Sequence, residues 1–507
     1  MELTLRGDYF NGAFSAKNGL TDKEIGASHE QISKTCPGNT NHTLWDAAIN
    51  YDHISPVVES AISGFKVWRK ISTLERINYL KKFQEAVEKR KDHIAMAIAL
   101  ETGKPLWESK TEAGAISGKV NVTIQDSLAR IEQKTIENIL PHIDGHIVYK
   151  PLGPTLVIGP YNFPCHLANG QILSALLTGN SIIFKPSEKT MYSSQLLIEC
   201  LHEANFPKGV INFINGTVKT TQDILKHPAI KGIFFTGSFA VGKKILESVG
   251  TDITKLVALE LGGKNSTIIH SDTDINHALP ELIRACYLST GQRCTSTSTV
   301  IIHKSIEQEF ISRFKDAASR IMVDHPTEYK VDPFMGPLID KLALEKFNQS
   351  IKMGEDNGAE ILLANEMLSL DHPGHYLSPS IHYLNEANKN NPFTQEEIFG
   401  PNCTFTPYEN IEDAIDIANI SDYGLAASIF TQDKDIYQTC LRDIDAGIIN
   451  LNRSTVGASS RLPFGGVKNS GNHHPAAVSM VDHTVSTVAS LETLDNSSKL
   501  EDVKGLR

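Results

Sequence analysis

Cys294 and Glu260 are the residues whose types and spacing best fit covalent chemistry on a carbonyl group. Cys294 lies in the stretch Ser289–Thr295, and Glu260 lies 34 positions earlier (294 minus 260), just before a pair of glycines. A thiolate can attack a carbonyl carbon, and a carboxylate can activate the water that then hydrolyses the resulting thioester. The alternatives are a buried structural thiol and a carboxylate that caps the following helix.

Asn162 is a third candidate for the same reaction. It lies in the loop Pro160–Pro164, where two prolines restrict the backbone. Its amide can donate to the oxygen that becomes negative when a thiolate adds to a carbonyl, and one such donor contributes about 3 kcal/mol. An Asn between prolines is also an ordinary turn residue, so this interpretation depends on Cys294 and Glu260.

Lys185, Ser187 and Glu188 have the composition of a ribose-binding loop. They follow a short apolar segment that predicts a buried strand. A lysine and a glutamate three residues apart can bind ribose hydroxyls, and the carboxylate would repel a phosphate on the 2′ oxygen. This favours NAD over NADP, although a solvated ion pair is the alternative.

The stretch 235–244 predicts a strand, a turn of small residues and the start of a helix. Gly237, Ser238 and Gly242 lie where free N–H groups of such a helix could bind a pyrophosphate. The stretch also nearly matches the P-loop of nucleoside triphosphatases, but Lys244 occupies the position that needs a hydroxyl for Mg²⁺. A turn without a ligand is the structural alternative.

Short apolar segments alternate with helical patterns, which predicts an α/β fold with a doubly wound parallel sheet. The predicted strands are Thr155–Ile158, Ser181–Phe184, Val210–Phe213, Gly232–Phe235 and Leu256–Leu259. A second α/β unit follows Cys294, with a strand at Thr299–Ile302, a helix from Ile306 to about Met322 and a strand at Gly447–Asn450. The active site is expected between the two units.

Eight separated motifs, in order, make the chain resemble the aldehyde dehydrogenase superfamily over nearly its full length. They are Glu101–Pro105, Pro160–Pro164, Phe184–Glu188, Phe235–Ser238, Leu259–Gly263, Gly291–Cys294, Glu396–Pro401 and Pro463–Gly466. The resemblance implies NAD-dependent oxidation of an aldehyde through a cysteine thiohemiacetal and thioester. An inactive structural member of the fold is the non-enzymatic alternative, which intact Cys294, Glu260 and Asn162 argue against.

The resemblance also implies roles for individual residues. Cys294 would attack the aldehyde, the Asn162 amide would bind the oxyanion and Glu260 would activate water. Glu397 and Lys185 would contact ribose, and Phe399 would lie against the nicotinamide.

Local patterns narrow the resemblance to the branch that oxidises N-succinylglutamate 5-semialdehyde in arginine catabolism. These patterns are Tyr161–Gly170, and Gly457–Ser460 followed by Pro463–Gly466 and Gly471–His473. That substrate carries two carboxylates, and Arg453 and Arg461 suit bidentate recognition of them. Solvated surface arginines are the alternative, and another acidic semialdehyde or a broader aldehyde range stays open as the substrate.

These observations predict four parts of the chain. We expect an NAD-binding domain at 1–130 and 150–261, a catalytic domain at 262–478, and a polar tail at 493–507. The segments 131–149 and 479–492 are rich in Ile, Val and Thr and could pair as an extension that reaches another subunit, giving a homodimer or homotetramer.

Composition restricts the remaining possibilities. The net charge of −11 disfavours nucleic acid, and no apolar run reaches the roughly 18 residues of a membrane span. Seven scattered cysteines without a C-x-x-C pair disfavour disulfides and zinc, so we assign no metal. No signal segment is apparent at the start, and we expect a cytoplasmic protein.

Overall fold

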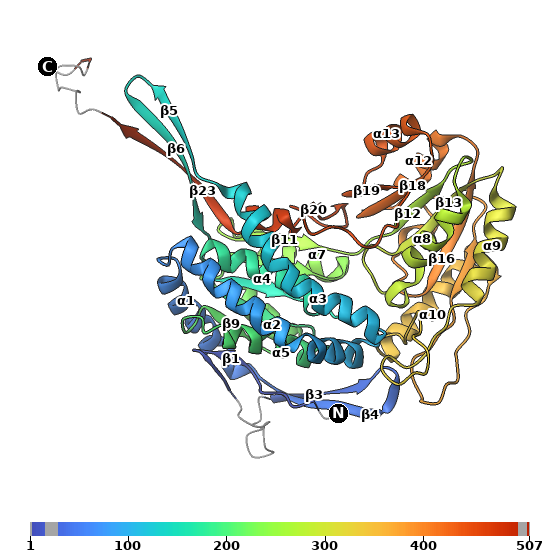
Figure 1. Ribbon diagram of the computed structural model, residues 1–507, viewed down its shortest axis with the longest axis horizontal. Coiled ribbons are helices and arrows are strands. Elements are labelled where there is room, and N and C mark those ends of the chain that lie inside the picture. Colours follow the sequence, from blue (N-terminus) through green and yellow to red (C-terminus); the bar gives the residue numbers. More distant parts are fainter. Residues whose placement is uncertain (1–2, 16–28, 495–503, 506–507) are drawn as a thin grey trace.

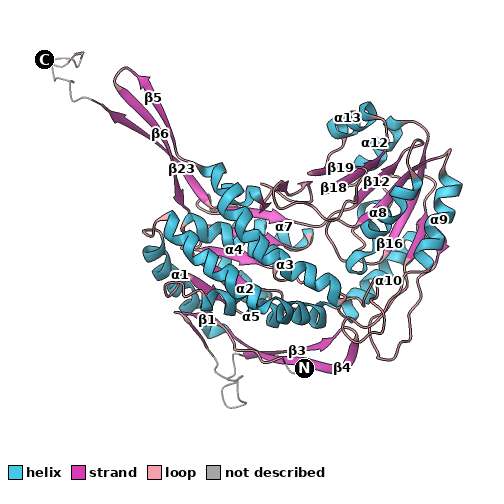
Figure 2. Ribbon diagram, in the orientation of Figure 1, coloured by secondary structure: helices cyan, strands magenta, loops and turns pink. Residues whose placement is uncertain are grey.

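The computed structural model describes residues 3–15, 29–494 and 504–505 (Figure 1). Most of the polar tail predicted at 493–507 lies outside these ranges. Two α/β units lie side by side, and a narrow β extension projects from the first (Figure 2). None of the helices in the described ranges combines the length and apolar character needed to span a bilayer.

The first unit is built on a seven-stranded sheet in which five consecutive strands are parallel, as the sequence predicted. In order across the sheet the strands are β11 (Leu256–Glu260), β10 (Gly232–Thr236), β7 (Thr155–Ile158), β8 (Ile182–Lys185), β9 (Ile211–Phe213), β1 (Tyr9–Phe10) and β2 (Ala13–Phe14). The chain runs outward from β7 in both directions, so the strand order reverses between β7 and β10. Ligands of such sheets bind at the carboxyl ends of the strands near this reversal.

Helices cover both faces of this sheet because successive strand residues point to opposite sides. Val157 and Phe184 pack with one core, whereas Leu156 and Ile183 pack with another. The first core is closed by α2 (Thr73–Thr102), α3 (Leu106–Val122), α4 (His166–Thr178) and α5 (Met191–Glu203). The second is closed by α1 (Ile54–Trp68), α6 (Val218–Leu225) and α7 (Phe239–Val249).

The α2 helix extends well beyond the amphipathic pattern visible from Leu74 to Val87. A capping box sets its start, since Ser72 Oγ accepts from the Glu75 N–H at 3.3 Å and the Glu75 carboxylate accepts from the Ser72 N–H at 3.2 Å. It ends where Gly103 adopts a φ of 85°. The chain then turns directly into α3.

The second unit also has a seven-stranded sheet. Its strands, in order, are β14 (Glu360–Leu363), β15 (Ser380–Tyr383), β16 (Asn402–Tyr408), β13 (Thr297–His303), β12 (Asn265–Ile269), β18 (Ala426–Phe430) and β19 (Ile448–Leu451). All neighbouring pairs are parallel except β14 with β15. Its helices are α8 (Ile275–Tyr287), α9 (Glu307–Ser319), α10 (Lys341–Asp356), α11 (Pro392–Gln395), α12 (Ile411–Asn419) and α13 (Lys434–Asp443). The predicted elements β13, α9 and β19 are present.

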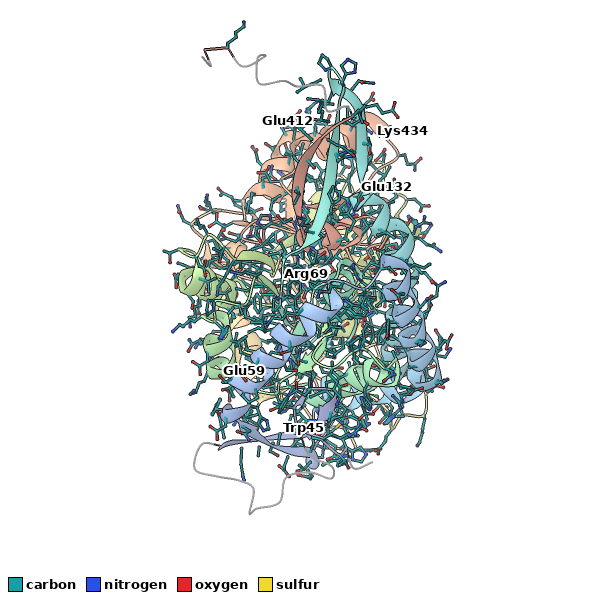
Figure 3. All side chains as sticks on the ribbon, turned by 90° about the vertical axis from the view of Figure 1, so that its left-hand side faces the viewer. Trp45, Glu59, Arg69, Glu132, Glu412 and Lys434 are labelled. Atoms are coloured by element: carbon teal, nitrogen blue, oxygen red, sulfur yellow. The ribbon has the colours of Figure 1, made fainter. Side chains whose placement is uncertain are left out.

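The extension consists of three antiparallel strands, β5 (Lys134–Leu140), β6 (Ile143–Pro151) and β23 (Val485–Thr493). β23 pairs with β6 from Val485 opposite Pro151 to Thr493 opposite Ile143, so the two segments that the sequence suggested could pair do so. Figure 3 views this extension from the side, with Glu132 labelled at its base and Trp45 at the opposite end of the molecule.

A hairpin that the sequence analysis did not predict runs along the base of both units (Figure 1). It is formed by β3 (His29–Cys36) and β4 (Asn39–Asn50). Lys34 Nζ donates to the Ile339 carbonyl at 3.1 Å, and the Gly38 carbonyl accepts from the Tyr376 hydroxyl at 2.7 Å. The hairpin therefore ties the first unit to the second.

Candidate active site

The candidate catalytic residues lie where the two sheets meet end to end. Glu260 is the last residue of β11, and Asn162 lies four residues beyond the end of β7. Cys294 lies three residues before β13, whose neighbour β12 begins at Asn265. The site is thus bounded by carboxyl ends of strands in the first sheet and amino ends of strands in the second.

The backbone before Cys294 has an unusual conformation. Ser289, Thr290 and Gly291 have φ values of 54°, 57° and 70°, a left-handed region that non-glycine residues adopt rarely. A Cβ on Gly291 would lie 2.1 Å from the Gly400 carbonyl oxygen, so this position also needs a glycine for close packing. Such a turn persists only when surrounding contacts fix it.

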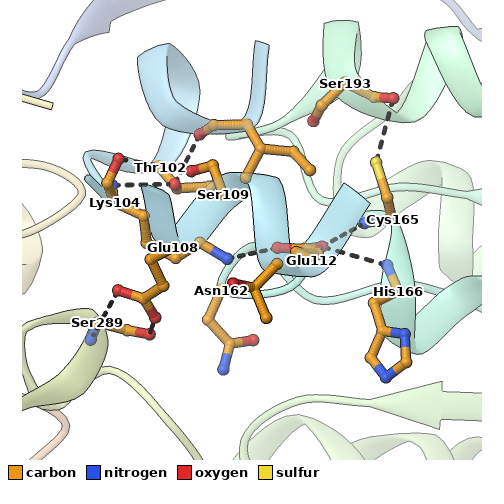
Figure 4. A network of polar contacts seen from close by, with 12 residues as sticks. Thr102, Lys104, Glu108, Ser109, Glu112, Asn162, Cys165, His166, Ser193 and Ser289 are labelled. Atoms are coloured by element: carbon orange, nitrogen blue, oxygen red, sulfur yellow. Dashed lines mark hydrogen bonds and ion pairs between the residues drawn. The ribbon is translucent and has the colours of Figure 1, made fainter. Parts of the chain in front are cut away.

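Glu108 supplies those contacts from α3. Its buried carboxylate accepts from the Ser289 N–H at 3.2 Å and from the Ser289 hydroxyl (Figure 4). It also accepts from Arg293 Nη2 at 2.6 Å. Burial would raise the pKa of Glu108, but the charges of Arg293 and Lys104 and the hydrogen bonds from Ser289 and Arg293 together lower it. The loop that carries Cys294 is therefore held by a buried ion pair.

Glu112, one turn further along α3, holds the loop that carries Asn162. Its carboxylate forms a buried ion pair with Lys104 and accepts from the N–H groups of Cys165 and His166, each at 3.1 Å. Those N–H groups belong to the start of α4, where Cys165 makes no side-chain cap of its own. Glu112 thus caps α4 from another helix, as Figure 4 shows.

Phe163 connects the two buried ion pairs. Lys104 Nζ lies 3.9 Å from the centre of the Phe163 ring, and the Arg293 guanidinium lies 5.0 Å from it. Because Phe163 follows Asn162 directly, these cation–π contacts fix the loop that carries the candidate oxyanion donor.

Asn162 is buried and donates from Nδ2 to the Gln292 carbonyl at 3.0 Å. An amide nitrogen has two hydrogens, so one stays available for a substrate oxygen. The contact orients Asn162 toward the residues next to Cys294. The Asn162 loop and the Cys294 loop are therefore in direct contact.

Asn265 is a positioning residue that the sequence analysis missed. Its Nδ2 donates to the carbonyls of Cys294 at 2.7 Å and Ser296 at 2.8 Å, while its Oδ1 accepts from the Ala426 N–H at 2.9 Å. A Cβ on Gly263 would lie 2.6 Å from Asn265 Oδ1 and 2.8 Å from the Cys294 carbonyl oxygen. The glycine pair after Glu260 is therefore needed for this close approach.

Glu260 and Cys294 are close enough to affect each other's proton affinity. Burial raises the pKa of Glu260 to about 8, contact with Cys294 lowers it, and Glu397 raises it further. Burial, followed by Glu260, also raises the pKa of the half-buried Cys294 thiol. Apart from the Cys294 thiol, the Glu260 oxygens meet no donor among the described residues. The carboxyl group thus keeps unused acceptor capacity.

Glu397 and Phe399 approach this site from the second unit. Glu397 Oε1 accepts from the Gly263 N–H at 3.0 Å, and burial raises its pKa to about 7. The Phe399 ring makes an edge contact with Tyr161, with centroids 6.0 Å apart. Both predicted cofactor contacts therefore lie beside the glycine turn and the Asn162 loop.

The remaining predicted cofactor residues follow β8 and β10. The Lys185 ammonium lies 3.6 Å from the Glu188 carboxylate, and Ser187 is buried beside them. Gly237 begins the turn before α7, whose N-cap Ser238 makes no side-chain hydrogen bond to the helix. A Cβ on Gly242 would lie 2.7 Å from Leu261 Cδ2, so this glycine is also explained by packing of α7.

Arg453 and Arg461 are both exposed. Arg461 is already paired, with Nε and Nη2 at 3.1 and 2.9 Å from the Asp126 carboxylate oxygens. A contact between either arginine and substrate stays a prediction. No group of three or more His, Cys, Asp or Glu in the described ranges is arranged to hold a metal ion.

Comparison with known protein families assigns this chain to one of them. The sequence model of the aldehyde dehydrogenase family matches residues 25–489, so the chain belongs to that family, as its motifs indicated. Two curated relatives that the chain resembles along most of its length are both named N-succinylglutamate 5-semialdehyde dehydrogenase. The Legionella pneumophila (strain Corby) protein is 38% identical over 488 residues, covering 96% of this chain and 95% of the relative. The Novosphingobium aromaticivorans protein is 36% identical over 453 residues, covering 89% and 94%.

Solved structures share the same architecture. An NAD-dependent aldehyde dehydrogenase from Sinorhizobium meliloti matches with a TM-score of 0.89 and 26% identity, over 97% of this chain and 96% of that one. A Thermus 1-pyrroline-5-carboxylate dehydrogenase with bound NAD matches with a TM-score of 0.88 and 25% identity, over 96% and 93%. The α/β fold class predicted from the sequence is confirmed.

Proposed function

We propose that this protein oxidises N-succinyl-L-glutamate 5-semialdehyde to N-succinyl-L-glutamate with NAD, through a covalent intermediate on Cys294. The observation that carries the reaction type is the meeting of Cys294, Glu260 and Asn162 between the ends of the two sheets. The substrate is supported by the relatives of that name, which are 36–38% identical along nearly the whole chain.

The residues at the ends of β8 and β10 fit NAD. The first N–H groups of α7 have no partners within the helix, and Ser238 does not cap them, so they suit a diphosphate. Lys185 and Glu188, paired at the end of β8, suit ribose hydroxyls. When bound, NAD would accept the hydride that leaves the aldehyde carbon.

The chain's own residues account for the other steps. The Cys294 thiol ionises, its proton passing to solvent, and the sulfur then bonds to the aldehyde carbon. The unused Asn162 hydrogen donates to the new oxyanion. Once the hydride has left, a thioester joins the acyl group to Cys294. Deprotonated Glu260 takes a proton from water, which attacks this thioester, releases the acid and restores the thiolate.

The β extension supports a proposal about assembly, namely a homodimer or homotetramer formed through these strands. Ile136, Ile139 and Leu140 of β5 are 47%, 46% and 50% exposed, which is unusual for apolar residues on one short strand. Light scattering after gel filtration tests this proposal, and a strictly monomeric protein would contradict it.

Seven free cysteines fit the reducing cytoplasm that we propose as the location of this protein.

NADH formation from a panel of aldehydes tests the substrate. We expect the highest kcat/KM for N-succinylglutamate 5-semialdehyde, lower values for neutral aldehydes such as propanal, and no turnover by Cys294→Ala. Preference for another aldehyde would refute the substrate assignment but would agree with the proposed reaction type. Absence of cysteine-dependent NADH with every aldehyde would refute the reaction and favour an inactive structural member.

A further inference from the structure

Lys119, near the end of α3, is a buried cation without an acidic partner. Its residue exposure is 6%, and its Nζ donates to Ser460 Oγ at 3.0 Å. Among the ion pairs of the described residues, Lys119 has no carboxylate, and burial lowers its pKa to about 8 with no acid to offset this effect. Lys104 on the same side of the unit is equally buried but is paired with Glu112. Buried charges are normally paired, so the exception at Lys119 needs an explanation.

His166 lies beside Lys119 and also has unused hydrogen-bonding capacity. Its Nδ1 is buried without a hydrogen-bond partner in the described part of the chain. Burial, followed by Lys119 and Lys104, lowers the pKa of His166 to about 3, so the ring is neutral near pH 7 and carries one N–H donor. A Cβ on Gly170 would lie 2.9 Å from Lys119 Cε, which places the lysine stem directly against α4.

These groups border the reaction centre from two directions. In Figure 4 the side chains of Asn162 and His166 point to the same side, away from the Glu112 carboxylate. Ser460 belongs to the loop that contains Thr455, whose hydroxyl lies 2.9 Å from that of Thr297, three residues after Cys294. The loop therefore runs from the nucleophile strand to Lys119.

We propose that Lys119, with the imidazole of His166 and the hydroxyl of Ser460, forms a subsite that binds a carboxylate of the aldehyde substrate. The three groups provide an ammonium, an N–H and an O–H on one side of the Asn162 loop, which matches the needs of a carboxylate entering a site shielded from water. This inference rests on the proposed function and names the residues that select an acidic aldehyde. It assigns that role to Lys119 in preference to the exposed Arg453 and Arg461.

Steady-state kinetics of three variants test the subsite. In Lys119→Met we expect the KM for N-succinylglutamate 5-semialdehyde to rise about 30-fold or more, the effect of losing one charged hydrogen bond, with kcat changed less than about threefold. The kcat/KM for propanal should stay within about threefold. Lys119→Arg should recover part of the affinity, and Lys110→Met, at an exposed position of the same helix, should match the wild type. Equal losses for both aldehydes in Lys119→Met would overturn the subsite.

Binding of the product separates this inference from the proposed function. We expect calorimetry to detect N-succinylglutamate on wild-type protein and Lys110→Met, with affinity at least tenfold lower for Lys119→Met and Ser460→Ala. If the wild type does not turn over the succinylated aldehyde but binds this triacid through Lys119, the proposed function fails and the subsite stands. Equal affinity of all variants for the triacid would overturn the subsite even if turnover is observed.

Discussion

The buried charged side chains near the start of α3 have partners of opposite charge, whereas the one near its end has none among the described residues. Near its start, Glu108 and Glu112 are paired with Arg293 and Lys104 and accept backbone N–H groups of the loops that carry Cys294 and Asn162. Near its end, Lys119 has a hydroxyl for a partner and no carboxylate. The three residues are spaced by four and seven positions and so share one helical face. The paired charges hold the loops in place, whereas the unpaired charge is available to a ligand.

The largest change in stability is expected when one member of a buried ion pair is removed. Glu108→Gln leaves the Arg293 guanidinium buried without its counter-ion and weakens the contacts that fix Ser289. We expect a loss of about 3–5 kcal/mol in unfolding free energy, because one buried charge loses its partner. Urea unfolding at fixed protein concentration measures this loss, and Glu85→Gln, at an exposed position of α2, is the control. A loss below about 1 kcal/mol would mean that the pair does not hold the loop.

The opposite result is expected at the other end of α3. Lys119→Met replaces a buried ammonium that lacks an anion with an apolar chain of similar length. Because the folded state no longer has to bury that charge, unfolding free energy should increase by about 1–3 kcal/mol. The same urea experiment measures the change, again beside Lys110→Met. A decrease in stability would show that Lys119 serves the fold rather than a ligand.

Glu260 is a further buried group with spare hydrogen-bonding capacity, since among the described residues it meets no donor other than the Cys294 thiol. Its pKa is raised to about 8, so it is mostly protonated at pH 6 and gains its basic form as pH rises. Thioester hydrolysis should therefore accelerate by about tenfold per pH unit below 8 and level off above it. Single-turnover hydrolysis of the acyl-enzyme between pH 6 and 9 measures this slope. A flat profile, or the same slope in Glu260→Gln, would exclude Glu260 as the base.

The sequence predicted the parts of this molecule that depend on local pattern. Five strands of the first sheet were recognisable because buried parallel strands form short apolar runs, and Cys294 and Glu260 were recognisable because their neighbours form motifs. The β3–β4 hairpin was missed because His29–Cys36 is rich in polar residues and lacks an apolar run. Its contacts include residues about 300 positions away, such as Ile339, which no local pattern indicates.

The site contacts missed from the sequence depend on tertiary pairing. Glu108, Glu112 and Lys119 resemble ordinary charged residues of a surface helix, and Lys104 lies in the turn before that helix. Only the fold shows that all four are buried. Arg461 was favoured for its bidentate geometry, yet in the structure Asp126 occupies that geometry. The fold determines which buried charges are paired. Paired residues position the loops, whereas an unpaired one is a candidate to contact a ligand.

The most direct test of the account is the mass of the enzyme during turnover. Glu260→Gln should still form the thioester on Cys294 but hydrolyse it slowly, because the base that activates water is lost. After brief mixing with NAD and N-succinylglutamate 5-semialdehyde, intact-protein mass spectrometry should show one N-succinylglutamyl adduct, mapped by peptide analysis to Cys294. An unmodified protein that nevertheless produces NADH, or an adduct on another residue, would contradict covalent catalysis by Cys294.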